Sequence, residues 1–183
     1  MNAATEPKEE GRGAMSATNE TPIDHVSLRA LQDRIDITDV LYRYSSAIDP
    51  FDNEGVRSVL ADDVWAQYGN LEPVSGADSL AEWIAGATST ITWQHHLLSV
   101  YHVEVDGDVA TALSYLTSYQ GFDAEPNVAK TLVARYHDEL RRTSEGWKIS
   151  RRVAEFLFGE SREPDDAWLS LLGGRGPEVW PRG

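Results

Sequence analysis

Five side chains in this sequence are of types that move protons or hold oxygen atoms: Tyr44, Asp49, Tyr68, His96 and Arg152. Histidine titrates near neutral pH and is therefore the usual group for proton transfer. A carboxylate that is hydrogen-bonded to one ring nitrogen fixes the tautomer of a histidine and stabilises its imidazolium form. Tyrosine can polarise or protonate an oxygen atom, and arginine can hold a carboxylate or an enolate-like anion. Brought together, these five residues would support acid–base chemistry.

Each of the five also has a purely structural interpretation. Asp49 directly precedes a proline and could serve only as the turn residue that ends a helix. His96 could be a polar residue at the start of a strand, and Tyr68 a half-buried strand aromatic. Arg151 and Arg152 are adjacent, so they face opposite sides of a strand and only one of them can reach a pocket. Spacing alone leaves both interpretations open.

The histidines do not form a metal-binding pattern. His96 and His102 would lie roughly 20 Å apart on a strand, and the sequence has no His-x-His or Glu-x-x-His pattern and no cysteine. It also lacks a glycine-rich phosphate loop and a Rossmann fingerprint. We therefore expect neither a metal nor an organic cofactor.

The first half of the chain shows helical periodicity, which predicts three helices. Apolar residues recur near a 3.6-residue spacing over residues 27–49, and this helix should end before Pro50. Shorter helices are expected over residues 52–60 and 76–88, with a strand over residues 64–68 between them. The apolar positions of the first helix are Leu28, Leu31, Ile35, Val40, Leu41, Tyr44 and Ile48.

Beyond these helices the period changes from 3.6 to 2, which predicts consecutive strands. Asp106-Gly107 is a strong two-residue hairpin signal. It joins strands expected over residues 97–105 and 109–119, and a second hairpin joins residues 128–140 to 147–158. Helices followed by antiparallel strands predict an α+β fold rather than an alternating βαβ sheet. We expect its pocket wall to include Trp65, Tyr115, Tyr119 and Phe156.

Composition limits the class of protein. The chain has 183 residues, of which 41% are hydrophobic, and a formal net charge of −14. This composition fits one domain and disfavours binding to nucleic acids or to anionic membranes. We expect tails at residues 1–22 and 161–183 around a domain at residues 23–160. Because the sequence shows neither a bilayer-spanning run nor a secretory signal, a cytoplasmic location is the default expectation.

Four segments carry a further signal: residues 37–49, which contain Ile37-Thr38-Asp39, residues 62–69, residues 95–108 and residues 146–152. They resemble SnoaL-like proteins of the nuclear transport factor 2 superfamily, and the resemblance covers about residues 27–158. It implies a cone-shaped fold of about three N-terminal helices packed on a strongly curved antiparallel sheet that encloses one pocket.

Within the superfamily the sequence looks like the lyase branch, which includes scytalone dehydratase, bile-acid 7α-dehydratase and hexachlorocyclohexane dehydrochlorinase. The resemblance places an Asp–His pair in the pocket, and Asp49 and His96 occupy its two positions. Tyr44 falls where bile-acid dehydratases have a tyrosine and the dehydrochlorinase has a lysine. Tyr68 matches a tyrosine of the dehydratases. Arg152 matches an arginine found in the bile-acid and dehydrochlorinase enzymes.

The resemblance therefore implies a cofactor-free lyase, a dehydratase acting on a small hydrophobic cyclic substrate of polyketide- or steroid-like type. His96 would remove a proton next to a carbonyl, and Arg152 would hold an acidic or enolate group. Val100 departs from the pattern, because many relatives have asparagine there. An isomerase or aldol-type cyclase with the same pocket, or a ligand-binding domain without activity, remains an alternative, since the fold does not fix the reaction. A homo-oligomer is also implied: a trimer as in lyase relatives, or a dimer as in other branches.

Overall fold

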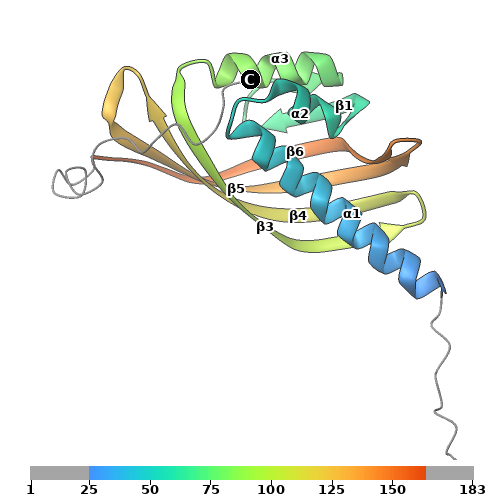
Figure 1. The fold of residues 1–183 in the computed structure, drawn as a ribbon. Helices are drawn as coiled ribbons and strands as arrows, with labels where there is room; N and C mark the ends of the chain where they lie inside the picture. Colours follow the sequence, from blue (N-terminus) through green and yellow to red (C-terminus); the bar gives the residue numbers. More distant parts are fainter. Residues whose placement is uncertain (1–24, 164–183) are drawn as a thin grey trace, which may run out of the picture.

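The structure, a computed structural model, describes residues 25–163 of the chain. Its elements are α1 (His25–Ile48), α2 (Asn53–Ser58), β1 (Leu60–Tyr68), β2 (Val74–Ser75), α3 (Ala77–Ala87), β3 (Ile91–Asp106), β4 (Val109–Phe122), β5 (Glu125–Thr143) and β6 (Gly146–Arg162) (Figure 1). This order confirms the expected α+β class, although the short strand β2 was not predicted. The two predicted tails lie outside the described residues, except that β6 continues past residue 160.

The six strands form one sheet in the order β2-β1-β6-β5-β4-β3. Neighbouring strands are antiparallel, except that β1 runs parallel to β6 with Tyr68 beside Ala154. The sheet is therefore mixed rather than wholly antiparallel. Local hairpin signals fix the direction of strands that follow one another, whereas β1 and β6 meet across most of the chain. No helix in the described range is long and apolar enough to cross a membrane.

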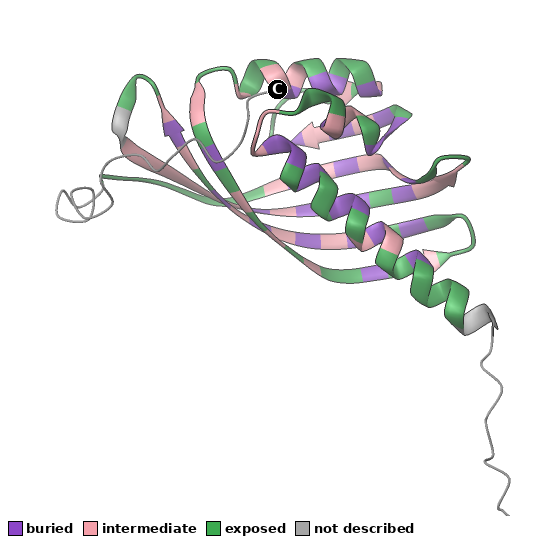
Figure 2. Cartoon of the chain, viewed as in Figure 1, coloured by how far each residue is buried: buried purple, intermediate pink, exposed green. Residues whose placement is uncertain are grey.

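The three helices lie on one face of the sheet, which we call the inner face (Figure 1). Tyr44 of α1 lies on Arg152 of β6, and Trp83 of α3 stacks on Tyr68 of β1. The opposite side, the outer face, is not covered by any helix of residues 25–163, and burial alternates along the strands (Figure 2). On β4 the buried inner-face residues are small or aliphatic: Ala110, Ala112, Ser114, Leu116 and Ser118.

α1 carries two apolar stripes, and only one of them packs on the sheet. The buried stripe consists of Ile37, Val40, Leu41, Tyr44 and Ile48. Leu28, Leu31 and Ile35 were expected to belong to it, but their side chains are 46–55% exposed. At about 100° of rotation per residue they fall opposite the buried stripe, on the same side as the exposed Tyr42.

Candidate active site

The side chains of Asp49 and His96 meet where the end of α1 lies against β3. Asp49 Oδ1 is 2.6 Å from His96 Nδ1, and Asp49 Oδ2 accepts the backbone N–H of His96 at 3.2 Å. The side chain of His96 is 7% exposed and that of Asp49 is 26% exposed. Gln94 of β3 contacts the end of α1, because its Nε2 donates to the carbonyl of Ile48 at 2.5 Å. The exposed His95 is 3.9 Å from Asp49 Oδ2, which is beyond hydrogen-bonding distance.

The turn that ends α1 fixes the position of Asp49. The N–H of Asp52 donates to the carbonyl of Ala47 at 2.9 Å, and the N–H of Phe51 donates to that of Ile48 at 3.0 Å. These two bonds define a Schellman motif, whose left-handed residue is usually glycine. Here that residue is Phe51, with φ of 63°. The carboxylate of Asp49 therefore lies two residues from a locally strained backbone position, a feature that is common at functional sites.

The bond to Asp49 decides which nitrogen of His96 can act as a base. A neutral imidazole carries a proton on one nitrogen and a lone pair on the other. Because a carboxylate only accepts, Nδ1 must carry the proton and Nε2 the lone pair. Among residues 25–163 nothing hydrogen-bonds to Nε2. This nitrogen is therefore free to take a proton from a ligand.

Tyr44 of α1 and Tyr68 of β1 are joined through their hydroxyl groups, whose oxygens lie 2.6 Å apart in the buried interior. The ring of Tyr68 stacks on that of Trp83, with centroids 5.0 Å apart. Burial, and next the closeness of Tyr44, raises the pKa of the Tyr68 hydroxyl well above its ordinary value. Since one hydroxyl donates to the other, one O–H of the pair is left to donate to a ligand.

Arg152 pairs with an acidic residue that the sequence analysis missed. Its Nε and Nη2 lie 2.7 and 2.9 Å from the two carboxylate oxygens of Asp138 on β5. The guanidinium also lies over the rings of Tyr44 and Tyr136, 3.9 and 4.2 Å from their centroids. Burial alone would lower the pKa of Arg152, but attraction to Asp138 outweighs it and raises the pKa well above its ordinary value. Arg152 is therefore a permanent buried cation.

A β-bulge in the hairpin of β5 and β6 turns Arg152 inward. Leu140 pairs with Ile149, but Glu139 pairs with Arg151, so β6 contains one extra residue at this point. Such an insertion shifts the alternation of side chains by one position. Ile149 and Arg152 are consequently both buried on the inner face, whereas Arg151 faces outward.

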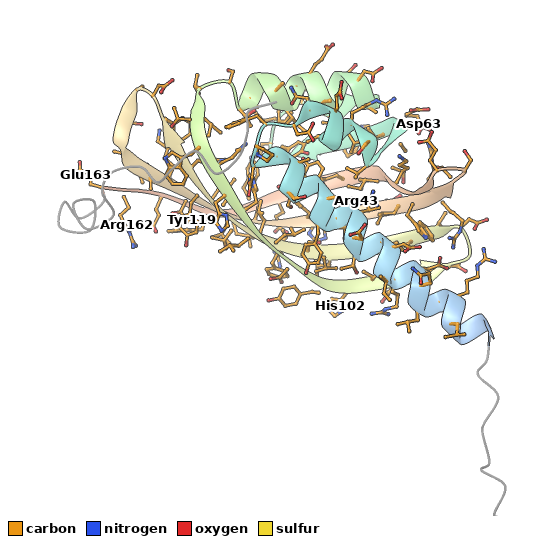
Figure 3. The ribbon with its side chains drawn as sticks, viewed as in Figure 1. Arg43, Asp63, His102, Tyr119, Arg162 and Glu163 are labelled. Carbon is orange, nitrogen blue, oxygen red and sulfur yellow. The ribbon has the colours of Figure 1, made fainter. Side chains whose placement is uncertain are left out.

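Three of the four aromatic residues expected on the pocket wall lie on the outer face instead. Trp65 packs there under the guanidinium of Arg151, 4.6 Å from its ring centroid. Tyr115 and Tyr119 alternate with the buried serines of β4, and Tyr119 lies on the side of the sheet away from α2 and α3 (Figure 3). Phe156 is the exception. It pairs with Ala134 of β5, which is buried on the inner face. The inner face of β4 instead carries only small or aliphatic side chains, from Ala110 to Ser118.

The two groups of polar residues are linked by α1, because Tyr44 and Asp49 are separated by about 7.5 Å of helix rise. Ser118 lies opposite His96 on the neighbouring strand. Its Oγ is buried without a partner in the described residues, as are Ser114 Oγ and Arg152 Nη1. Such atoms are rare in folded proteins. All three atoms belong to buried residues of the inner face, and residues 25–163 hold no cluster of three or more potential metal ligands.

Comparisons with known proteins place the chain among relatives. Residues 29–153 match the family model described as the SnoaL-like domain. An uncharacterised protein of Mycobacterium tuberculosis (strain ATCC 25618 / H37Rv) is 28% identical over 134 residues, which cover 73% of this chain and 91% of that protein. A solved structure of a proposed aromatic ring hydroxylase from Novosphingobium aromaticivorans is 26% identical with a TM-score of 0.65, covering 74% of this chain and 96% of that one.

Two further structures are similar in fold. A proposed scytalone dehydratase from Novosphingobium aromaticivorans is 16% identical with a TM-score of 0.68, covering 85% of this chain and 99% of the other. A hexachlorocyclohexane dehydrochlorinase (LinA, type 2) is 16% identical with a TM-score of 0.69, covering 84% and 99%. At this identity the likeness shows the fold alone, an α+β cone with helices on one face of the sheet.

Proposed function

The chain belongs to the SnoaL-like family, and on that basis we propose that it is a cofactor-free lyase of dehydratase type that acts on a small hydrophobic cyclic molecule. The observation that carries the proposal is the Asp49–His96 pair, joined at 2.6 Å, with Nε2 of the histidine left without a protein partner in the described residues. The names of two structural relatives, a proposed dehydratase and a dehydrochlorinase, support an elimination reaction.

The proposed reaction removes a proton and a hydroxyl group from neighbouring carbon atoms. His96 Nε2 takes the proton from the carbon next to a carbonyl, and Asp49 stabilises the imidazolium that forms. The free O–H of the Tyr44–Tyr68 pair donates to the carbonyl oxygen as it gains negative charge. The imidazolium then returns its proton to the departing hydroxyl, so that a C–O bond breaks, a C=C bond forms and water leaves.

A second candidate is an isomerase or an aldol-type cyclase. A single base that removes a proton and returns it elsewhere is sufficient for isomerisation. His96 is positioned for this, since its Nε2 is free while Asp49 holds its other nitrogen. A domain that binds a ligand without turnover would keep the same contacts as a satisfied buried pair.

The test uses a panel of cyclic β-hydroxy ketones in D₂O. A lyase should produce enones, detected by their ultraviolet absorption, without placing deuterium next to the carbonyl, because the proton that His96 removes leaves in the water. An isomerase would catalyse deuterium exchange without loss of water, and a binding domain would do neither. His96→Ala should remove either signal. A correctly folded His96→Ala protein with undiminished turnover would remove the proposed mechanism.

A further inference from the structure

Arg152 is the cation beside the tyrosine pair, and its charge is already balanced by the protein. Two guanidinium nitrogens contact both carboxylate oxygens of Asp138, at 2.7 and 2.9 Å. The side chains of Arg152 and Asp138 are only 2% and 0% exposed, respectively. A two-point Arg–carboxylate pair in a water-excluded site is a strong and geometrically specific contact. A second carboxylate entering here would meet the charge of Asp138 as well as that of Arg152.

The remaining polar groups at this end of the site are hydrogen-bond donors without a free charge. The Tyr44–Tyr68 pair has one O–H to offer, and Arg152 keeps one buried nitrogen, Nη1, without a partner among residues 25–163. The guanidinium already lies over the rings of Tyr44 and Tyr136, at 3.9 and 4.2 Å from their centroids. Asp49 adds a further negative charge at the other end of the site.

We infer that the buried end of the site selects an uncharged oxygen, such as that of a ketone or a hydroxyl group, and rejects carboxylates. This selectivity is due to Asp138. The inference deepens the proposed function and rests on it in one respect, that the ligand enters between α1 and the inner face. It replaces the expectation that Arg152 holds an acidic group. Asp138 acts as a specificity-determining residue through Arg152 and need not touch the ligand.

The chain offers a matched control on the other side of the sheet. Arg135 and Glu155 form the same kind of two-point ion pair, at 3.0 and 2.8 Å, but their side chains are 32% and 43% exposed on the outer face. Glu155→Gln therefore makes the same chemical change as Asp138→Asn, away from the site. It should leave ligand selection unchanged.

The experiment compares two probes that share one ring system, 2-acetylnaphthalene and 2-naphthoate, at pH 7.5. Affinity is measured by calorimetry. The ketone should bind the wild-type protein at least tenfold more tightly than the carboxylate. Asp138→Asn should strengthen naphthoate binding at least tenfold and change ketone binding little. Glu155→Gln should behave as the wild type.

The wild-type comparison tests the inference even if Asp138→Asn does not fold. Equal affinity for the two probes, tighter binding of the carboxylate, or no binding of either would overturn it. A folded Asp138→Asn protein that still rejects naphthoate would overturn the role of Asp138. Failure of the proposed function looks different, because the ketone would then bind as expected while no enone forms and no deuterium is exchanged.

Discussion

Asp49 holds His96 at two points, since one carboxylate oxygen lies 2.6 Å from Nδ1 of the ring and the other accepts the backbone N–H of the same residue at 3.2 Å. The carboxylate therefore fixes the ring relative to its own strand. Neither oxygen is free to turn toward a ligand without breaking one of these bonds. Asp49 is thereby suited to orienting the base rather than to acting as one.

Replacing Asp49 by asparagine should abolish turnover while the fold survives. The amide oxygen would accept the backbone N–H of His96, and the amide nitrogen would donate to Nδ1. The ring proton would then move to Nε2 and remove the basic lone pair. We expect both Asp49→Asn and His96→Ala to lose about 10²–10⁴-fold in turnover, as general-base losses do.

The control for these two variants is their melting temperature, measured beside turnover. If the pair is only structural, either substitution should instead cost about 1–3 kcal/mol of stability and leave ligand affinity almost unchanged. A variant that loses stability but keeps its turnover would contradict the catalytic assignment.

The hydroxyl pair of Tyr44 and Tyr68 should show strong coupling. Tyr44→Phe or Tyr68→Phe alone leaves one buried hydroxyl without its partner, which should cost about 1–3 kcal/mol. Removing both hydroxyls leaves no orphaned group, so the double variant should lose less stability than the sum of the two single variants. Urea unfolding of the four proteins measures this. Simple additivity would show that the 2.6 Å contact contributes nothing to stability.

Asp33 should account for part of the pH dependence of the protein's stability. Burial alone would raise the pKa of its carboxyl, but the ion pair with Arg142 at 2.8 Å and the bond from Trp147 outweigh burial and lower the pKa. A carboxyl whose pKa is lower in the folded state adds stability above its unfolded pKa, and this stability is lost as the pH falls through the folded pKa. Asp33→Asn should therefore lower stability at pH 7 by about 1–3 kcal/mol.

The same variant should flatten the loss of stability below about pH 4, the ordinary pKa of aspartate. Thermal unfolding between pH 2 and pH 7 checks both effects. Asp63→Asn is the control, because Asp63 also pairs with an arginine, Arg141, but is 70% exposed. Its effect should be small and should vanish in salt. An equal effect of the two variants would contradict the assignment to the buried pair.

The outer face should mediate self-association. Leu97, Tyr101 and Tyr119 are 52%, 60% and 39% exposed there, and contiguous apolar surface of this kind often marks an interface. Light scattering at micromolar concentration should show an oligomer, with a trimer expected, and Leu97→Glu with Tyr119→Glu should dissociate it. Leu31→Glu, equally exposed on α1, is the control. Dissociation by Leu31→Glu alone would show that the interface lies on α1. A monomeric wild-type protein would contradict self-association.

The hairpin and the contacts of the site differ in how far the sequence determines them. The period-2 pattern and Asp106-Gly107 predict the hairpin of β3 and β4, because turn chemistry and alternation are local, although β3 begins at Ile91 rather than at Leu97 and β4 ends at Phe122 rather than at Tyr119. Alternation does not say which face the helices cover, so Tyr115 and Tyr119 were placed on the wrong side. The contact of Asp138 with Arg152 also escapes a local analysis. A regular hairpin would place Asp138 opposite Arg151, and no glycine marks the bulge that shifts the register.

The parallel pairing of β1 with β6 governs the order in which a growing chain can complete its sheet. β1 is synthesised early, yet within the described residues its partners are only the two-residue β2 and the late strand β6. Contacts between residues so distant in sequence form slowly, since a long loop must close first. During synthesis, one edge of β1, the strand that carries Tyr68, therefore stays unpaired until β6 is made and brings Arg152 beside β1. A product terminated before β6 would lack both the strand that pairs with that edge and the buried Arg152, so it would be prone to aggregation.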